Sequence, residues 1–496
     1  MTVSIKRLAG RLSGAPAIVA GAVLLRVLAG VGFVNYDTLY ALAWGGQLSR
    51  GETPAYGVPI APTPHPLLEL LGVVLSPLGP RAVDDVTVAL GFLALSACAW
   101  VIYRLGADWF GRAAGALAAL IFITRMPVLS YGVRAYVDLP YVLLVLGALL
   151  VESRSRRAAA RPAGAPVLVL LALAGLLRPE AWAFSGLYWL HLLGVPQRLL
   201  RRRGGEWLPS PSRAELVRLT LLAAAAPLVW VLSDLAVTGQ PLWSLTNTRH
   251  TASTLGRETG IVNVPEYIPR RIGEILRPPA LLAAALGGAL SLAWLRRSAL
   301  LGAAAGVLAV VVFAAFAAAG LPINTRYAFL AAAILCIFAG AGAFGWTRLD
   351  PGDRRRRWWM AGGALAIVAL LAYAPADYRS ADRELGKLAR QQSIERDLLA
   401  LVDDHAINLR CGPVGVPNHA PVPLLALYLE TSPVNVVSLE TGHTHIASGV
   451  YVDPASIEVE RDYVLDRRDP HQEAAVPPGF SASRANRSWL IFQRCM

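Results

Sequence analysis

The sequence predicts an α-helical polytopic membrane protein with a small α/β domain at its C-terminus. Hydrophobic residues make up 55% of its 496 residues and charged residues only 16%, against about 25% in ordinary soluble domains. The charge is also uneven: 34 basic and 17 acidic residues precede position 376, whereas 16 acidic and 12 basic residues follow. This composition argues against a soluble enzyme and a disordered chain. A nucleic-acid binder would need the net charge of +13 on one basic face.

The membrane part is predicted from apolar runs near the length of about 20 residues that a spanning helix needs. Clear runs lie at 15–34, 86–104, 111–129, 219–239, 279–295, 299–320, 328–346 and 358–375, with shorter ones at 137–151 and within 166–194. The first run follows Lys6 and Arg7 but lacks a convincing cleavage site. We therefore expect it to be a retained anchor.

Orientation follows from the basic loops, which normally lie in the cytoplasm. The strongest are 152–162, 197–205 and 350–357. Placing them and the N-terminus inside predicts eleven spans in the plasma (inner) membrane, with the C-terminus outside. The segment 66–79 is then interfacial or re-entrant, and 166–194 forms two short helices that turn at Arg178–Pro179–Glu180.

Two domains follow from this topology. Residues 1–375 form the membrane domain, with extracytoplasmic loops 35–85 and 240–278, and residues 376–496 form an extracytoplasmic α/β domain. Within the latter, 380–405 is an amphipathic helix, and apolar runs at 434–437 and 489–492 are strands. An oxidising exterior permits a disulfide between Cys411 and Cys495, and the alternative is two unpaired thiols.

Polar and ionisable groups gather on the extracytoplasmic side of the predicted membrane domain. Such groups are costly at membrane depth, so they usually pair or line a cavity. The candidates for a substrate site are Asp37, His65, Arg134, Asp138, Arg178, Glu180, Arg249, His250, Arg326 and Tyr327. Because the loop charges alone place them all on one face, their convergence predicts a functional site there.

The order of these motifs resembles the GT-C superfamily of integral-membrane glycosyltransferases, which includes protein O-mannosyltransferases and aminoarabinose transferases. The matching features are Asp37 after the first span, the turn Pro64–Leu67, Asp138-Leu139-Pro140, and Arg326-Tyr327 before a late span. Together they cover most of residues 1–346. The chain departs from the family in having Thr38 where many members have a second acid, and in having His65 near the position of a family lysine.

The resemblance implies an inverting transfer of a sugar from a polyprenyl-phosphate donor to a glycan, lipid or protein acceptor outside the cytoplasm. It implies Asp37 as general base, with Arg326, Tyr327 and Arg178 at the donor phosphate. Asp138 would orient the acceptor or sugar, or pair with Arg134. The remaining candidates (His65, Arg134, Glu180, Arg249 and His250) would line the substrate cavity. No metal site is assigned, although a divalent ion could bind if His65 and His250 met.

Each assignment has a structural alternative. Asp37 and Asp138 could be helix N-caps, Arg326 could extend to lipid headgroups, and Arg178 with Glu180 could be a pair that closes the short hairpin. Two other functions remain open: a polytopic transporter or lipid flippase, and a non-catalytic scaffold of an envelope assembly. A transporter favours polar residues at the bilayer midplane, whereas the polar groups here lie at one edge.

Overall fold

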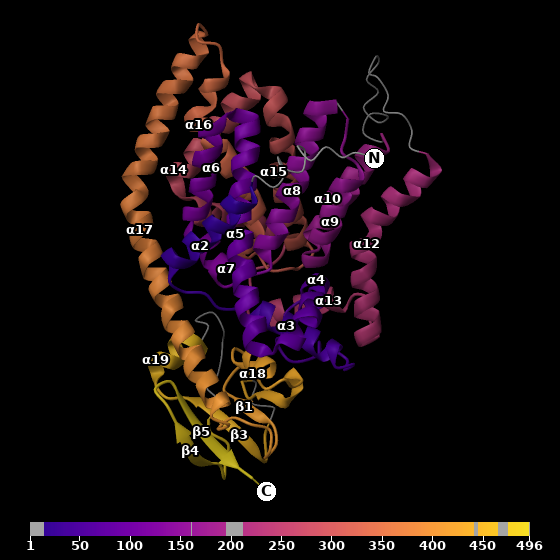
Figure 1. Ribbon diagram of the computed structural model, residues 1–496, viewed down its shortest axis with the longest axis vertical. Coiled ribbons are helices and arrows are strands. Elements are labelled where there is room, and N and C mark those ends of the chain that lie inside the picture. Colours follow the sequence, from indigo (N-terminus) through magenta and orange to yellow (C-terminus); the bar gives the residue numbers. More distant parts are fainter. Residues whose placement is uncertain (1–13, 160, 195–211, 441–444, 465–474, 496) are drawn as a thin grey trace.

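The computed structural model describes residues 14–159, 161–194, 212–440, 445–464 and 475–495. It is elongated, with a helical bundle at one end and a sheet domain at the other (Figure 1). The predicted basic run at 197–205 and the basic residues Lys6 and Arg7 lie outside the described residues.

The first half of the bundle contains two long helices, α5 (Pro80–Phe110) and α8 (Asp138–Ala159), and several shorter ones. The shorter ones are α2 (Ala15–Ala29), α3 (Tyr36–Ser49), α4 (Pro66–Leu75), η1 (Ser76–Leu78), α6 (Arg112–Thr124), α7 (Met126–Val133), α9 (Ala165–Leu177) and α10 (Glu180–Leu192). The predicted short pair in 166–194 is therefore present, with its turn at Arg178–Pro179.

The second half contains the remaining helices of the bundle. They are α12 (Arg213–Thr238), α13 (Trp243–Thr254), η2 (Ile261–Asn263), α14 (Val264–Trp294), α15 (Arg296–Ala318), η3 (Thr325–Ala328), α16 (Phe329–Phe344), η4 (Gly345–Arg348) and α17 (Arg354–Asp403). The short helices α3, α4 and α13 lie between the long helices and the sheet domain (Figure 1).

Six helices of the described residues are long and apolar enough to cross a membrane, and the pair α6 and α7, bent by 66°, would be a seventh. The predicted runs 86–104, 219–239, 279–295, 299–320, 328–346 and 358–375 coincide with these six helices, and none extends more than two residues beyond its helix. The helices α2 and α9 and the segment Pro66–Leu78 are apolar but shorter. The total of eleven spans stays a prediction.

The helix α16 lies at the centre of the bundle, with 89% of its apolar window buried. Glycines let its neighbours approach it closely, as small residues do between membrane helices. A Cβ added at Gly287 of α14 would lie 1.9 Å from the carbonyl oxygen of Phe338 in α16. This packing holds α16, which follows the turn η3 directly, in place within the bundle.

The helix α17 joins the two ends of the molecule. The predicted span at 358–375 and the predicted helix at 380–405 are one continuous helix, and Pro375 lies inside it. Asp377, just beyond the proline, pairs with Arg125 at 2.8 Å and with Arg277 at 3.4 Å. These ion pairs tie α17 to the break between α6 and α7 and to a kink in α14.

The C-terminal domain is built on a five-stranded sheet of order β2-β1-β3-β5-β4. Its strands are β1 (Val414–Val416), β2 (Val436–Ser438), β3 (Gly449–Pro454), β4 (Ser481–Ala485) and β5 (Trp489–Arg494), and its helices are α18 (Val422–Tyr428), η5 (Pro433–Asn435), α19 (Ile457–Val459) and η6 (Glu460–Val464). β1 pairs in parallel with β2 and β3, whereas β5 pairs antiparallel with β3 and β4. The predicted α/β composition is confirmed.

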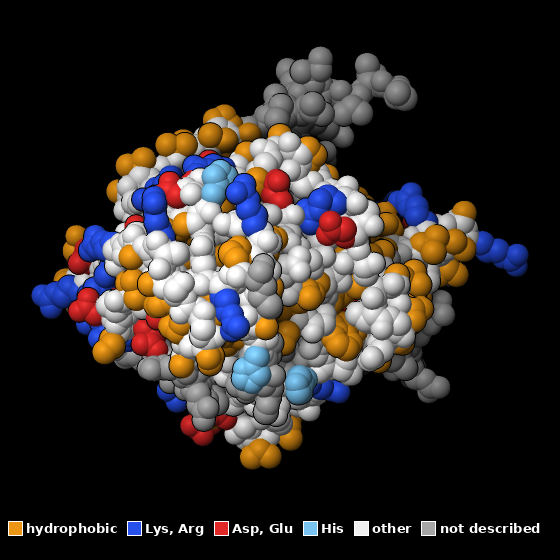
Figure 2. Space-filling model, turned by 90° about the horizontal axis from the view of Figure 1, so that it is seen from below, with side chains coloured by type: hydrophobic (Ala, Val, Ile, Leu, Met, Phe, Trp, Pro, Cys, Tyr) orange, Lys and Arg blue, Asp and Glu red, His pale blue; other side chains and the backbone are white. Residues whose placement is uncertain are grey.

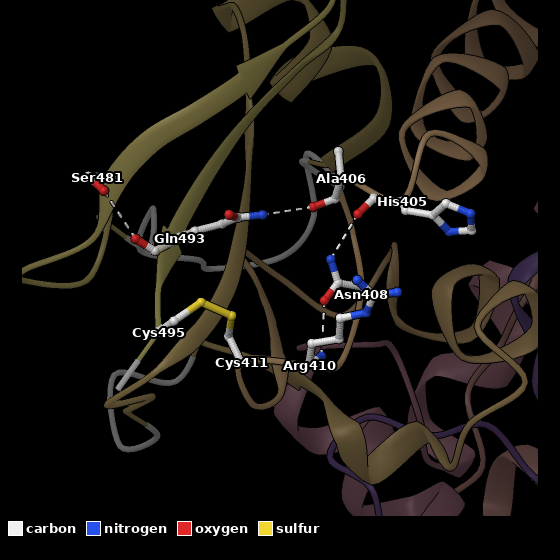
Figure 3. Close-up of a disulfide and its surroundings, with 8 residues drawn as sticks. All are labelled: His405, Ala406, Asn408, Arg410, Cys411, Ser481, Gln493 and Cys495. Carbon is white, nitrogen blue, oxygen red and sulfur yellow. Dashed lines mark hydrogen bonds between the residues drawn. A yellow bond between two sulfur atoms is a disulfide. The ribbon is translucent and has the colours of Figure 1, made fainter.

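Cys411 and Cys495 form a disulfide, with 4.8 Å between their Cα atoms (Figure 3). The bond joins the segment before β1 to the end of β5. It resolves the two alternatives that the sequence leaves open. Cys98 and Cys336 are free and buried in the bundle.

The sheet domain packs directly against the helix that carries Asp37. One hydrophobic cluster contains Tyr40 and Trp44 of α3 together with Leu425 of α18 and Leu398 of α17. A hydrogen bond from Gln47 of α3 to Ser432 at 3.2 Å reinforces this contact, and the Tyr428 hydroxyl donates to Asp84 of α5 at 3.1 Å. The end of the molecule seen in Figure 2 carries scattered side chains of both charges and no single basic face.

Candidate active site

Asn35 fixes the start of α3 and thereby the position of Asp37. Its side-chain oxygen accepts hydrogen bonds from the backbone N–H groups of Asp37 at 2.9 Å and Thr38 at 3.2 Å. Its amide donates to the carbonyls of Arg134 at 3.0 Å and Ala135 at 3.1 Å. Asn35 is therefore the N-cap, and the structural alternative that assigned this role to Asp37 is wrong. The Asp37 carboxylate does not cap the helix and can bind other groups.

Asp37 forms an ion pair with Arg326 of η3. The two side chains are 15% and 18% exposed, so water screens them only partly. Burial alone would raise the pKa of Asp37, but the Arg326 guanidinium outweighs this effect, and the net pKa lies below the usual value. Asp37 is consequently an anion at neutral pH, and Arg326 is directed at a carboxylate rather than at lipid headgroups.

A second ion-pair group lies beside the first. Arg178, between α9 and α10, donates to Asp138 at the start of α8 and to Glu180, with Nε 3.0 Å from Oε1 of Glu180. All three side chains are nearly inaccessible to water. The expectation that Asp138 pairs with Arg134 is wrong, because the packing of α8 against α9 brings Arg178 closer. Arg178 and Glu180 do pair as one alternative expected.

Tyr327 separates the two arginines. Its ring centroid lies 4.4 Å from the Arg178 guanidinium carbon and 5.7 Å from that of Arg326. Both distances are typical of cation–π contacts. The two ion-pair groups therefore share one aromatic ring, and two guanidinium groups face the same small volume. Such an arrangement suits an anion with several oxygens, such as a phosphate.

Two cavities meet at the Asp37–Arg326 pair, because both residues line each of them. The apolar cavity, of about 270 Å³, is otherwise lined by Thr63, His65, Arg178, Pro179, Glu180, Trp182, Trp230, Val231, Asp234, Pro241, Leu242, Ser244, Leu245, Thr248, Phe316, Ala319, Leu321 and Tyr327. The polar cavity, of about 630 Å³, is otherwise lined by Tyr36, Tyr131, Tyr136, Leu255, Gly256, Arg257, Glu258, Tyr267, Arg270, Arg271, Ile323, Asn324, Thr325, His419 and Ala420. The first lies among α10, α12, α13 and α15, and the second reaches the C-terminal domain.

His65 belongs to the apolar cavity and is 7% exposed. Burial lowers its pKa to about 4, so the imidazole is uncharged at neutral pH. Its Nδ1 is buried without a hydrogen-bond partner among the described residues. His65 can therefore donate or accept a hydrogen bond to a ligand, but it does not supply the positive charge of the family lysine near that position.

Four candidates lie outside both cavities. Asp138 is enclosed by its pair with Arg178, and the other three are Arg134, Arg249 and His250. Arg134 donates to Ser130 and packs over the rings of Tyr131 and Tyr136, which do line the polar cavity. Arg249 donates to the carbonyl of Ala319 at 2.6 Å, and His250 is exposed on α13. The expectation that these three line the cavity is wrong, because their elements direct them to other partners or to solvent. In the described part of the chain no group of three or more metal-ligating side chains is suitably placed.

Sequence reasoning missed several lining residues. Trp182 and Trp230 form an edge-to-face pair with ring centroids 5.5 Å apart, and Arg257, Arg270 and His419 line the polar cavity. Trp and Arg recur throughout this chain, so neither stands out locally. His419 could not be found, because only the docking of the C-terminal domain brings it to the membrane domain.

No protein-family model matches the sequence, and no curated protein matches it. Among solved structures, the chain is similar to ArnT from Cupriavidus metallidurans bound to undecaprenyl phosphate, with a TM-score of 0.57 and 13% identity over 97% of this chain and 98% of that one. AglB, the oligosaccharyltransferase from Archaeoglobus fulgidus, in complex with an inhibitory peptide and a dolichol-phosphate, has a TM-score of 0.45 and 12% identity over 86% of this chain and 65% of that one. The length of the match to ArnT, over both the bundle and the C-terminal domain, shows that the chain has the same fold as ArnT.

Proposed function

We propose that the chain is a membrane glycosyltransferase that moves a sugar from a polyprenyl-phosphate donor to an acceptor outside the cytoplasm, with inversion at the sugar. The observation that carries this proposal is the Asp37–Arg326 pair at the meeting point of an apolar and a polar cavity. A transferase needs such a point, because the donor and the acceptor must reach one base from two directions.

The apolar cavity suits the donor. It lies between α12 and α15, whose apolar windows are only 17% and 28% buried, so both helices expose most of their surface to lipid. Trp230 and Phe316 line the cavity, and Arg178 and Arg326 stand at its inner end. An isoprenoid chain in the bilayer could thus extend along apolar side chains while its phosphate meets the two guanidinium groups. The ArnT structure with its bound undecaprenyl phosphate is the precedent for this ligand.

The polar cavity suits the acceptor. It is more than twice as large as the apolar cavity and reaches His419 of the C-terminal domain. The acceptor would enter between this domain and the bundle, on the extracytoplasmic side that the basic loops predict. Residues 1–375 would then hold the donor, and residues 376–496 would form one wall of the acceptor site.

The chemistry requires one proton transfer and one leaving group. The acceptor hydroxyl oxygen attacks the anomeric carbon of the sugar, and the bond from that carbon to the phosphate oxygen breaks. Asp37 takes the hydroxyl proton, and the polyprenyl phosphate leaves with the bonding electron pair, stabilised by Arg326 and Arg178. Attack from the polar cavity, opposite the departing phosphate, inverts the anomeric configuration.

Donor binding would also prepare the base. In the ligand-free site Arg326 is paired with Asp37 and holds its pKa low, which makes the carboxylate a weak base. A donor phosphate competes for the same guanidinium. When Arg326 turns to the phosphate, the Asp37 carboxylate loses its main partner and its pKa rises. The base is therefore strengthened only when a donor is present.

The test is a donor panel on the purified full chain in nanodiscs. Undecaprenyl-phosphate-linked mannose, glucose and aminoarabinose would each be incubated with an extract of the envelope, and sugar transfer and released undecaprenyl phosphate would be measured. The proposal expects at least one donor to be consumed in step with sugar transfer. Failure to bind undecaprenyl phosphate and to consume every donor would contradict it.

A further inference from the structure

The polar cavity carries more positive than negative charge. Four arginines line it: Arg257, Arg270, Arg271 and Arg326. Among the carboxylates, Asp37 is paired with Arg326, and Glu274 is shared by Arg270 at 3.3 Å and Arg271 at 3.0 Å. Glu258 and Asp37 are the two carboxylates that line the cavity itself.

Arg257 differs from the other three arginines. The described residues provide no ion pair or hydrogen bond to its guanidinium, and its side chain is exposed at the cavity wall. Its charge is close enough to Asp37 to contribute to the lowered pKa of that carboxylate, after the effects of burial, Arg326 and His65. A ligand group held by Arg257 would therefore lie near the proposed base.

The opposite wall belongs to the C-terminal domain. The His419 ring lies 5.4 Å from that of Tyr36, the residue before Asp37, in an edge-to-face contact. Glu440 holds His419 through both its backbone N–H and its Nδ1, each at 2.9 Å. The cavity is thus bounded by a cation on the bundle and by a fixed aromatic and polar wall on the sheet domain.

We propose that the polar cavity recognises an anionic group, a phosphate or a carboxylate, on the acceptor, and that Arg257 binds this group. The inference rests on the proposed function and extends it by giving the chemical class of the acceptor. A guanidinium fork matches the paired oxygens of both groups. An anionic group bound there places the neighbouring acceptor hydroxyl beside Asp37. The group could belong to a water-soluble glycan or to an anionic phospholipid headgroup.

The experiment compares three variants of the full chain in phosphatidylcholine nanodiscs loaded with undecaprenyl phosphate, the ligand that the proposed function assigns to Arg326 and Arg178. Arg257→Gln removes the charge, and Arg257→Lys keeps it without the fork. Arg249→Gln is the matched control, because Arg249 lies on the preceding helix α13, is also exposed, and lines neither cavity. Thermal stabilisation by glucose 6-phosphate, glucuronate and glucose is measured for each.

The proposal expects saturable stabilisation by at least one anionic sugar and none by glucose at the same concentrations. Arg257→Gln should raise the half-saturating concentration of the anionic sugar by roughly tenfold or more, as expected for a lost charge-assisted hydrogen bond. Arg257→Lys should keep part of the affinity, and Arg249→Gln should keep all of it. Equal stabilisation by glucose, an unchanged Arg257→Gln variant, or no stabilisation by any anionic sugar or lipid would overturn it.

A second arm identifies the source of the anion. Nanodiscs of phosphatidylglycerol replace phosphatidylcholine, and an Arg257-dependent stabilisation by this lipid, with no further effect of the sugars, would assign the site to a headgroup. Undecaprenyl phosphate binding by the wild-type chain is measured in the same samples. Its absence would defeat the proposed function, whereas its presence without any effect of Arg257 would defeat only the anionic acceptor.

Discussion

Arg326 forms an ion pair with Asp37, although 289 positions separate the two residues in the chain. The contact joins η3, held by the central helix α16, to α3, held by the C-terminal domain. Both partners line the apolar and the polar cavity. The proposed reaction is centred on this contact.

Replacing Arg326 with Ala should weaken undecaprenyl phosphate binding by about tenfold or more, because a charge-assisted contact to the phosphate is lost. Binding would be measured by titration in nanodiscs. Arg249→Ala is the control, since Arg249 bonds only to a backbone carbonyl among the described residues. Equal affinities of the Arg326→Ala variant and the wild type would remove Arg326 from the phosphate site.

Replacing Arg178 with Leu should destabilise the protein strongly, by about 3–5 kcal/mol, the usual cost of breaking a buried ion pair. The substitution leaves the carboxylates of Asp138 and Glu180 buried without their cation. Thermal unfolding in detergent gives the comparison, with Arg134→Leu as a control, because no described acid pairs with Arg134. A smaller loss of stability for Arg178→Leu than for Arg134→Leu would contradict the structural role of the ion-pair group formed by Arg178, Asp138 and Glu180.

Glu395, in the half of α17 that packs near the C-terminal domain, should make stability depend on pH. Burial raises the pKa of Glu395 to about 8. The charge of Asp84 adds to this rise, whereas the Gln391 side chain and Arg134 oppose it. An unfolded Glu has a pKa of about 4.3. Between these values the folded state holds a proton that the unfolded state has lost, so stability falls as pH rises.

Glu395→Gln keeps the shape but removes this proton. The variant should match the wild type near pH 4 and exceed its thermal unfolding midpoint increasingly up to pH 8. Unfolding midpoints measured across this pH range provide the check. A higher midpoint for the wild type than for the variant at pH 8 would show that Glu395 is charged and stabilising in the folded chain.

Removing the disulfide should destabilise the C-terminal domain. Cys411 and Cys495 close a loop over a sequence separation of 84, and such a bond typically contributes about 2–4 kcal/mol. The double variant Cys411→Ser and Cys495→Ser should be cut faster by protease within the sheet domain, and reductant should do the same to the wild type. Reductant should leave the double variant unchanged. Equal cleavage rates before and after reduction of the wild type would contradict the contribution.

The sequence predicted much of the bundle, because hydropathy marks a spanning helix along its whole length. It also predicted Asp37, Asp138 and Arg326 as a group through loop charge and motif order. It placed a boundary at Pro375, which instead lies within α17. Membrane helices tolerate proline where neighbouring elements satisfy the freed backbone groups.

The pairings within the site could not be predicted. Whether Asp138 meets Arg134 or Arg178 depends on how α8 packs against α9, and no local pattern encodes it. The same holds for Arg257, which lies in a loop without a motif, and for His419, which reaches the cavity only through the docking of the sheet domain. Tertiary packing decides these contacts.

The most direct test of the central claim is sugar transfer by Asp37→Asn, with undecaprenyl phosphate binding measured on the same sample. The amide keeps the size of the side chain but cannot accept the hydroxyl proton. We expect transfer to fall by at least about a hundredfold, in line with the loss of a general base, while the donor lipid still binds. Transfer at the wild-type rate by this variant would contradict the role of Asp37 as the base.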